Sequence, residues 1–287
     1  MAVASAYDDL AAGWDAGAGL VYGPLARVLV GASPVELRGC VALDVGSGTG
    51  FVADAAAGRG ARVVAVDRSA TMVAYQDGGR GRVVGDVLRL PFRKGAFDAV
   101  LAGFLINHMA PEPALASLGR VVRPGGAVVA STWAVVALDP VKDAIDRVVM
   151  SWGWVPPEWY RVMKEDVLPV SGDPALLAGA ARTAGLVDVS TVLYRTDLEH
   201  DAVAAVAYRL ALPHIAPWVA GLAVGARATL VEEARVAVAP HVAGWRPAMI
   251  VLSGRVPARD EDTRPRPPMP AAAPRIAPSQ APAPPRT

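Results

Sequence analysis

The segment Leu43-Asp-Val-Gly-Ser-Gly-Thr-Gly50 decides the fold that we expect of this 287-residue chain. The apolar run Val41–Val45 leads into it, and the alanine-rich stretch Phe51–Gly58 follows it. This order predicts a strand, a tight glycine turn and a helix. Glycines in such a turn let the backbone reverse sharply and let a ligand approach the main-chain N–H groups closely. The segment therefore predicts a site for a nucleotide-like cofactor.

The spacing of the glycines narrows the class of cofactor. A dinucleotide-binding turn has the pattern G-x-G-x-x-G/A, whereas Gly46, Gly48 and Gly50 give G-x-G-x-G. Phe51 occupies the position where the dinucleotide pattern needs a third small residue for close helix–strand packing. The sequence therefore disfavours a nicotinamide-dependent oxidoreductase.

Strands and helices alternate on both sides of this turn. Short apolar runs predict strands at residues 41–45, 62–66, 82–84, 97–102, 127–132, 187–194 and 248–256. Helices are predicted at residues 51–58, 70–76, 113–122, 174–184, 202–212 and 226–238, with an amphipathic helix near 141–149 and two short N-terminal helices, the second near 25–30. Apolar strands that alternate with helices predict a mostly parallel sheet buried on both faces.

Acidic residues follow three successive strands of the predicted sheet, at the edge where such sheets bind ligands. Asp67 ends the second strand, and an acidic side chain there is placed to accept both hydroxyls of a ribose. Asp86 follows the third strand, where its carboxylate can accept from an adenine amine while the Val87 N–H faces a ring nitrogen. Asp44 is placed to orient the glycine turn or to meet the amino group of a methionine moiety.

The matching motifs continue along residues 35–135. They are Ala42-Leu-Asp-Val-Gly-Ser-Gly-Thr-Gly50, Val64-Ala-Val-Asp67, Gly85-Asp86, Leu90-Pro-Phe92, Phe97-Asp-Ala-Val100 and Arg120-Val-Val-Arg-Pro-Gly-Gly126. In their order and spacing the chain resembles the class I S-adenosylmethionine (SAM) dependent methyltransferases, in particular the small-molecule branch similar to the ubiquinone/menaquinone-biosynthesis methyltransferases. The resemblance implies a Rossmann-like α/β fold: a seven-stranded, mostly parallel sheet with helices on both faces, an antiparallel last strand and a helical lid insertion.

The resemblance also implies the cofactor SAM and a set of residues that contact it. The predicted cofactor-binding residues lie in the glycine turn, after the second and third strands and after the fourth strand: Asp44, Gly46, Ser47, Gly48, Gly50, Asp67, Arg68, Asp86, Val87 and Phe104. The segment Tyr7-Asp-Asp-Leu-Ala11 looks like the family's lid over the cofactor.

We expect three parts along the chain. Residues 1–34 form an N-terminal helical lid, and residues 35–256 form the methyltransferase domain, with the cofactor core at 35–135 and an acceptor lid insertion at about 139–170. Residues 257–287 are rich in Pro, Ala and Arg, and such a composition predicts disorder because it buries too little apolar surface.

Candidates for a general base are His108 after the fourth strand, His214 in the Leu212-Pro-His-Ile215 segment, and Tyr160. The alternative for both histidines is a structural role. His200 and His241 are expected in surface turns. The tryptophans 152, 154 and 159 are expected either to wall an acceptor pocket or to pack the insertion onto the core.

We therefore expect a methyltransferase that transfers a methyl group from SAM to a small molecule by direct in-line displacement. One alternative is an enzyme of the same fold that binds SAM but catalyses a cyclisation or rearrangement in natural-product biosynthesis. Another is a partner subunit that binds SAM without catalysis.

Composition excludes other classes. The 28 basic and 27 acidic residues nearly cancel, which argues against a nucleic-acid partner. The single cysteine, Cys40, excludes an intramolecular disulfide and a zinc cluster, so we expect no metal. The apolar stretch 203–226 is interrupted by Arg209 and two prolines, and the N-terminus has no signal-peptide pattern. We expect a cytoplasmic protein without a membrane partner, while the sequence leaves its oligomeric state open.

Overall fold

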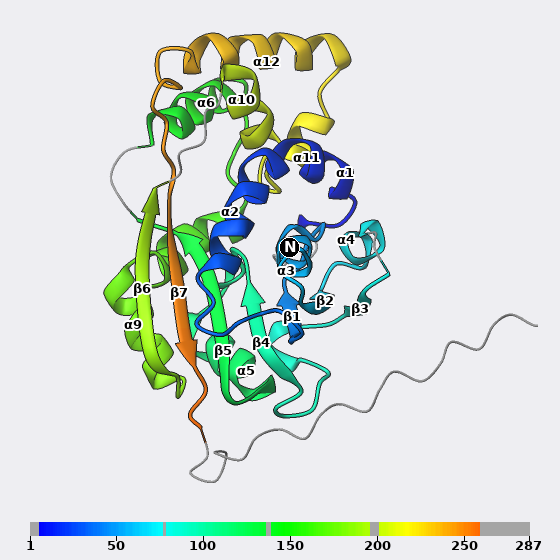
Figure 1. The fold of residues 1–287 in the computed structure, drawn as a ribbon. Coiled ribbons are helices and arrows are strands. Elements are labelled where there is room, and N and C mark those ends of the chain that lie inside the picture. The colour runs from blue at the N-terminus through cyan, green and yellow to red at the C-terminus, as the bar shows by residue number, and fades with distance from the viewer. Residues whose placement is uncertain (1–5, 77–78, 136–138, 196–200, 259–287) are drawn as a thin grey trace, which may run out of the picture.

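The computed structural model describes residues 6–76, 79–135, 139–195 and 201–258. In these residues seven strands form one sheet in the order β3-β2-β1-β4-β5-β7-β6 (Figure 1). The strands are β1 (Val41–Val45), β2 (Arg62–Asp67), β3 (Gly81–Val84), β4 (Phe97–Ala102), β5 (Val122–Trp133), β6 (Val187–Arg195) and β7 (Ala248–Arg255). Residues 259–287, where we expect disorder, lie outside the described residues.

The sheet is parallel except at one strand. β1 pairs in parallel with β2 and β4, and β4 pairs in parallel with β5; Leu43, for example, lies between Val64 and Val100. β7 inserts between β5 and β6 and is antiparallel to both. The Rossmann-like sheet with an antiparallel last strand is therefore confirmed.

Alternation along β4 explains why the sheet is buried on both faces. All six residues of β4 are buried. Ala99 and Leu101 belong to one apolar cluster, whereas Val100 and Ala102 belong to a second cluster on the other face. Successive side chains of a strand point to opposite faces, so an apolar run of this length needs helices on both sides.

Helices supply both apolar layers. α2 (Gly19–Gly31) and α3 (Phe51–Gly58) contribute to the first cluster, and α5 (Pro111–Val121) and α9 (Pro174–Thr183) contribute to the second. The other helices are α1 (Ala11–Gly13), α4 (Ala70–Tyr75), α6 (Pro140–Ser151), α7 (Glu158–Val162), α8 (Leu168–Ser171), α10 (Ala202–Leu210), α11 (Ala216–Ala220) and α12 (Val224–Val238). Within the described ranges, no helix has the length and apolarity needed to cross a membrane.

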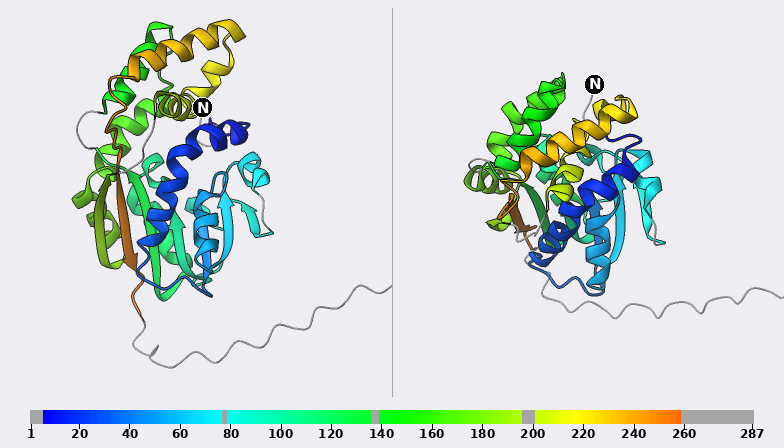
Figure 2. Two further views of the ribbon diagram at one scale, coloured as in Figure 1. Left: turned by 45° about the horizontal axis from the view of Figure 1, so that its top comes forward. Right: turned by 90° about the horizontal axis from the view of Figure 1, so that it is seen from above.

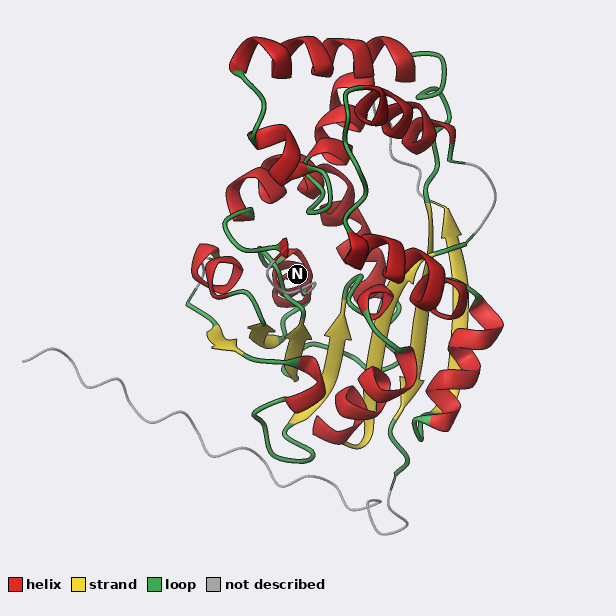
Figure 3. Ribbon diagram, turned by 180° about the vertical axis from the view of Figure 1, so that it is seen from behind, coloured by secondary structure: helices red, strands yellow, loops and turns green. Residues whose placement is uncertain are grey.

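A helical layer lies beyond the carboxyl ends of the parallel strands and comes from two separate parts of the chain (Figures 2 and 3). α6, α7 and α8 follow β5, whereas α10, α11 and α12 connect β6 to β7. α12 packs along α6, and the indole N–H of Trp152 donates to Glu233 on α12 at 2.6 Å. The insertion expected at residues 139–170 is thus only half of this layer.

The N-terminal helices differ from the sequence-based prediction. Tyr7 precedes the first helix, and the chain passes from α1 through a wide turn at Trp14–Ala18 directly into α2. The helix expected near residues 25–30 is present, but it is part of the longer α2, which continues through Pro24. An internal proline costs a helix about 3 kcal/mol. Here the buried side chains Val21, Leu25 and Leu29 pack one face of α2 into the core and offset that cost.

Candidate active site

A cavity of about 350 Å³ lies where β1, β2 and β4 end. Its walls come from the glycine turn, from the residues that follow β2, β3 and β4, and from the N-terminal segment. The predicted cofactor residues that line it are Gly46, Ser47, Gly48, Asp67, Arg68, Asp86, Val87 and Phe104. The structure therefore brings together eight residues that the sequence places in four separate loops.

The backbone of the glycine turn explains why glycine is needed there. Gly46, Gly48 and Gly50 have φ values of 68°, 52° and 104°, a region that disfavours residues with a Cβ. At Gly46 a Cβ would also lie 2.9 Å from the side chain of Leu105 on the cavity wall. Side chains at these positions would strain the turn and reduce access to its N–H groups.

Asp67 ties the turn to the end of β2. Its carboxylate accepts from the N–H of Gly48 at 2.8 Å and from the N–H of Ser69 at 2.9 Å. Burial raises the pKa of Asp67, while these two N–H groups oppose the increase. The carboxylate thus lies on the cavity wall with a fixed orientation.

Asp86 and Val87 form the opposite end of the cavity. Asp86 accepts from the N–H of Leu88 at 2.9 Å and thereby caps a short helical turn, Val87–Arg89. Val87 is buried, whereas Asp86 keeps part of its surface exposed toward the cavity that it lines. The Asx-type contact fixes the carboxylate beside the Val87 N–H.

Two predicted cofactor residues do not line the cavity. Gly50 serves the turn through its backbone conformation, and Asp44 is fully buried behind the turn. Burial raises the pKa of Asp44 to about 8, with the N–H of Ala53 partly opposing the increase. Asp44 therefore lies enclosed by the protein and outside the cavity lining.

Phe104 has the unusual backbone conformation of the wall after β4. Its φ of 53° is rare for a residue with a side chain and costs about 1–3 kcal/mol. The conformation is held because its N–H donates to Ser131 at 3.2 Å and its ring packs on Tyr22 and Trp133, with centroids 4.8 and 4.5 Å away.

The N-terminal segment closes the cavity with aromatic rings. Tyr7 packs edge-on against Trp14, and Trp14 stacks on Tyr22 with centroids 5.0 Å apart. The hydroxyl of Tyr7 lies 2.9 Å from Nε2 of His108. Tyr7 therefore connects the N-terminal segment to the turn after β4, which sequence reasoning did not predict beyond the general role of a lid.

A second cavity, of about 860 Å³, lies under the helical layer. Four residues line both cavities: Tyr7, Trp14, Tyr22 and His108. The two spaces therefore adjoin across a wall, which we call the shared wall, made of these four side chains.

His108 lies at the shared wall and lines both cavities. Shielding from bulk water lowers the pKa of His108 to about 4, so its imidazole is neutral at pH 7. Its Nδ1 has no hydrogen-bond partner among the described residues. Burial also raises the pKa of Tyr7 well above its usual value, so this hydroxyl keeps its proton.

The other candidate bases lie deeper in the second cavity. His214 lines only that cavity and stacks on Tyr160, with centroids 3.8 Å apart and an interplanar angle of 7°. Of the tryptophans, Trp159 lines this cavity, whereas the buried Trp154 donates its indole N–H to the carbonyl of His214. His241 lies in a turn after α12, as expected, is partly exposed and also lines this cavity, while His200 lies outside the described residues.

Several residues of the second cavity were not predicted as site residues. Tyr22, Trp133, Tyr208, Arg209 and Trp245 all line it. One signal was present for Arg209, since it is an isolated charge in the apolar run 203–226. No local pattern marks the others, because they come together only through the packing of distant helices.

The chemistry of the first cavity fits SAM. Its charged lining residues in the described chain are the carboxylates of Asp67 and Asp86 and the guanidinium of Arg68. Carboxylates complement ribose hydroxyls, amine N–H groups and a sulfonium charge, and the exposed N–H groups of the glycine turn complement a carboxylate. Aromatic and aliphatic walls can enclose an adenine ring.

Comparison with known proteins agrees with this assignment. A family model described as "Methyltransferase domain" matches residues 43–130. A demethylmenaquinone methyltransferase of Thermobifida fusca is 33% identical over 178 residues, which cover 55% of this chain and 72% of that protein. A malonyl-[acyl-carrier protein] O-methyltransferase of Serratia marcescens is 36% identical over 153 residues, covering 51% of this chain and 58% of the relative.

The fold also matches solved structures. The phosphoethanolamine N-methyltransferase 2 of Haemonchus contortus, solved with SAM, superimposes with a TM-score of 0.54 at 17% identity and covers 82% of this chain and 52% of its own. This likeness concerns the fold alone. Sequence relatives, family model and cavity chemistry together show that the chain belongs to the class I SAM-dependent methyltransferases, with SAM as its cofactor.

Proposed function

We propose that this enzyme transfers the methyl group of SAM to a small-molecule acceptor that occupies the second cavity, by direct in-line displacement. The observation that carries the proposal is the shared wall. A cofactor in the first cavity and an acceptor in the second would meet at Tyr7, Trp14, Tyr22 and His108. Placing two reactants against each other in a space shielded from water supplies much of the rate enhancement.

The residues of the first cavity would hold SAM as follows. Asp67 accepts from the ribose hydroxyls, and Asp86 with the Val87 N–H binds the adenine edge. Gly46, Ser47 and Gly48 face the amino-acid part, with Arg68 and Phe104 completing the walls. Gly50 acts indirectly, through the backbone conformation that it gives the turn. When bound, SAM supplies an electrophilic methyl group on a sulfonium whose leaving group is a neutral thioether.

Tyr7 and His108 would take the proton of the acceptor. Because Tyr7 lies 2.9 Å from Nε2 of His108, a proton that leaves an acceptor hydroxyl or amine has a path through the Tyr7 oxygen to His108. His108 is a weak base, with a pKa of about 4. The proton therefore moves as the new bond to the methyl group forms, and not in a separate earlier step.

We further propose that the helical layer is the acceptor lid, with residues 1–34 covering the cofactor side. Both α6–α8 and α10–α12 belong to it, since lining residues of the second cavity come from α6, α7 and α10. We infer a small molecule and no nucleic-acid partner, because the site is an interior cavity and the chain carries nearly balanced charge.

Incubation with SAM labelled in its methyl group and a small-molecule extract of the host tests the proposal. We expect label in a low-molecular-weight product together with an equal amount of S-adenosylhomocysteine. Label recovered only in nucleic acid would contradict the proposed acceptor class. A substrate that changes while SAM remains unconsumed would replace methyl transfer by the cyclisation or rearrangement that other enzymes of this fold could catalyse.

A further inference from the structure

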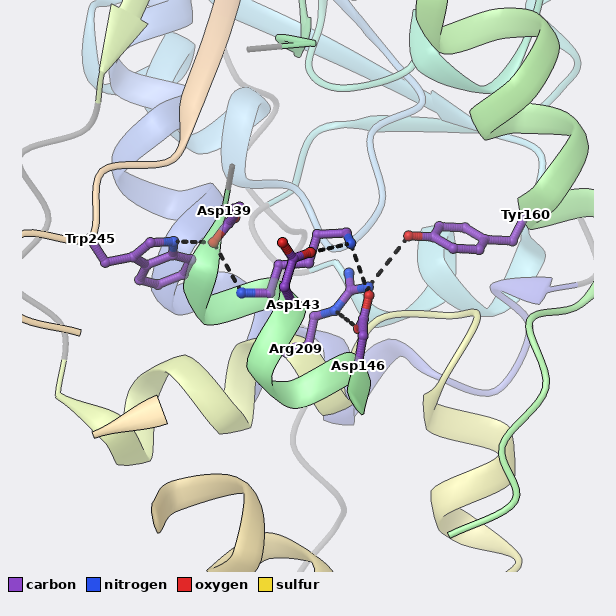
Figure 4. Close-up of polar contacts among 7 residues, drawn as sticks. Asp139, Asp143, Asp146, Tyr160, Arg209 and Trp245 are labelled. Atoms are coloured by element: carbon purple, nitrogen blue, oxygen red, sulfur yellow. Dashed lines mark hydrogen bonds and ion pairs between the residues drawn. The ribbon is translucent and has the colours of Figure 1, made fainter. Parts of the chain in front are cut away.

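The second cavity has a polar end built around Arg209 of α10 (Figure 4). Arg209 is only 5% exposed. Its Nε and Nη2 donate to Asp146 of α6 at 2.9 and 2.7 Å, and Nη2 also lies 3.4 Å from the hydroxyl of Tyr160. Lys142, one turn before Asp146 on α6, contacts the same carboxylate at 2.9 Å.

This network leaves donors that are not used. Among the described residues, Nη1 of Arg209 has no hydrogen-bond partner, and no dashed line reaches it in Figure 4. Arg209 lines the cavity, whereas its carboxylate partner Asp146 does not. The fork of the guanidinium is thus fixed in place while one of its nitrogen atoms remains available.

His214 lies beside this network with a second unused polar atom. The residue is 7% exposed, and its Nε2 has no hydrogen-bond partner in the described part of the chain. Stacking on Tyr160 holds the ring parallel to a residue that contacts Arg209. Burial, followed by the positive charges of Arg209 and Lys142, lowers the pKa of His214 well below its usual value.

Basic residues outnumber acidic residues around the cavity, and one of the acidic residues, Asp143, pairs with Lys142 at 3.2 Å. The basic side chains among its described lining residues are Lys142, Lys164, Arg195, Arg209 and Arg246, and the acidic ones are Asp139 and Asp143. Asp139 is held by the indole N–H of Trp245 and caps α6 through the N–H of Lys142. The first cavity, in contrast, has two carboxylates and one guanidinium.

We propose that the acceptor carries an anionic group, a carboxylate or a phosphate, that binds Arg209 with His214 and Lys142 at the polar end of the second cavity. The rest of the acceptor is apolar or aromatic, since Trp133 and Tyr208, whose rings contact Tyr22 of the shared wall, line the remaining space. This assignment rests on the proposed function only in naming the ligand an acceptor. The anion site itself exists whether or not a methyl group is transferred.

A pair of fluorescent probes tests the site without any knowledge of the substrate. The sulfonate 8-anilinonaphthalene-1-sulfonate and the neutral N-phenyl-1-naphthylamine share the aromatic skeleton and differ in the anionic group. We expect the protein to bind the sulfonate about tenfold more tightly or better, as one charge-assisted hydrogen bond implies. Equal affinity for the two probes would overturn the proposal.

The variant must remove the anion site without leaving a buried charge alone. Arg209→Met by itself leaves Asp146 unpaired and can unfold the lid, so the double variant Arg209→Met/Asp146→Leu replaces the whole pair. We expect it to lose the preference for the sulfonate while its affinities for the neutral probe and for SAM stay unchanged. A preference for the sulfonate that survives in the double variant would contradict the assignment. An equal loss of affinity for both probes would contradict it as well.

A matched control is the double variant Arg235→Met/Glu232→Leu. It removes another arginine–carboxylate pair of the lid, on α12, whose residues do not line the cavity. We expect unchanged preference there. Competition by 1-naphthoate and by 1-naphthyl phosphate then separates a carboxylate from a phosphate, and failure of both to displace the sulfonate would overturn the proposal. Failure of the labelling experiment with success here would reject methyl transfer and keep the anion site.

Discussion

The two cavities of this protein are built in different ways. The first cavity takes its polar groups from loops that follow β1, β2 and β3, so most of its polar lining residues lie within residues 45–87. The second collects residues from Tyr7 to Ala248 and owes its shape to helices inserted at two places in the chain. The first has an excess of carboxylates, and the second an excess of basic groups. The cationic cofactor and the anionic acceptor that we propose would thus be separated by charge before they meet at the shared wall.

The strongest test of this comparison is the shared wall itself. His108→Gln should lower kcat about 100-fold or more with the acceptor that labelling identifies, because the proton would lose its final acceptor. The affinity for SAM, measured by calorimetry, should stay the same. Tyr7→Phe should act in the same direction, since it interrupts the path to His108.

His241→Gln is the matched control for His108→Gln, because His241 lines the second cavity and not the first. Its kcat should be unchanged. Normal turnover in His108→Gln would show that methyl transfer needs no base at the shared wall.

A substitution at Asp67 should separate the cavities by ligand. Asp67→Asn should weaken SAM binding by about 3 kcal/mol, because charge-assisted hydrogen bonds to the ribose become neutral and one N–H contact of the turn is lost. Binding of the fluorescent sulfonate in the second cavity should not change. Asp54→Asn, at an exposed carboxylate of α3, controls for charge. Unchanged affinity for SAM in Asp67→Asn would mean that the ribose lies elsewhere.

The contributions of Asp44 and His108 to folding stability should depend on pH in opposite directions. Asp44 has its pKa raised to about 8 in the folded protein, so the folded state favours its protonated form. Its stabilising contribution is present at low pH and is lost as pH rises from about 4 to 8, by at most about 1.4 kcal/mol per pH unit. In thermal unfolding without ligand, the stability of Asp44→Asn relative to the wild type should therefore increase from pH 5 to pH 8.

His108 has the reverse sign, because its folded pKa of about 4 lies below the unfolded value. The neutral form stabilises the protein above pH 6.5, and this contribution is lost as pH falls from about 6.5 to 4. In the same unfolding measurement, the stability of His108→Gln should depend less on pH over that range than the stability of the wild type does. Parallel curves for the wild type and this variant would refute the burial argument.

The smallest effect is expected where the two halves of the lid meet. Trp152→Phe removes the indole N–H that donates to Glu233 and should lower the free energy of unfolding by about 0.5–1 kcal/mol. Chemical denaturation measures this change. Trp218→Phe is a suitable control, since it is the same substitution in a neighbouring helix of the lid, and a larger loss there would assign the effect to ring size.

The sequence predicted the first cavity far better than the second. Gly46, Gly48, Asp67 and Asp86 each follow a strand at a fixed distance, so strand period and turn chemistry place them without tertiary information. Asp44 lies within β1, and although it is close to the same turn it does not line the cavity. Arg209 and Tyr22 obey no such spacing. They line the same cavity because α2 and α10 pack together, and helix packing of this kind leaves no local pattern in the sequence.

The shared wall has a thermodynamic consequence. Because Tyr7, Trp14, Tyr22 and His108 contact both spaces, a ligand that orders these rings in one cavity prepares them for a ligand in the other. Such coupling is reciprocal: whatever factor S-adenosylhomocysteine adds to the affinity for the acceptor, the acceptor must add to the affinity for S-adenosylhomocysteine. The two occupants, opposite in charge and held by unrelated parts of the chain, would then bind as a cooperative pair.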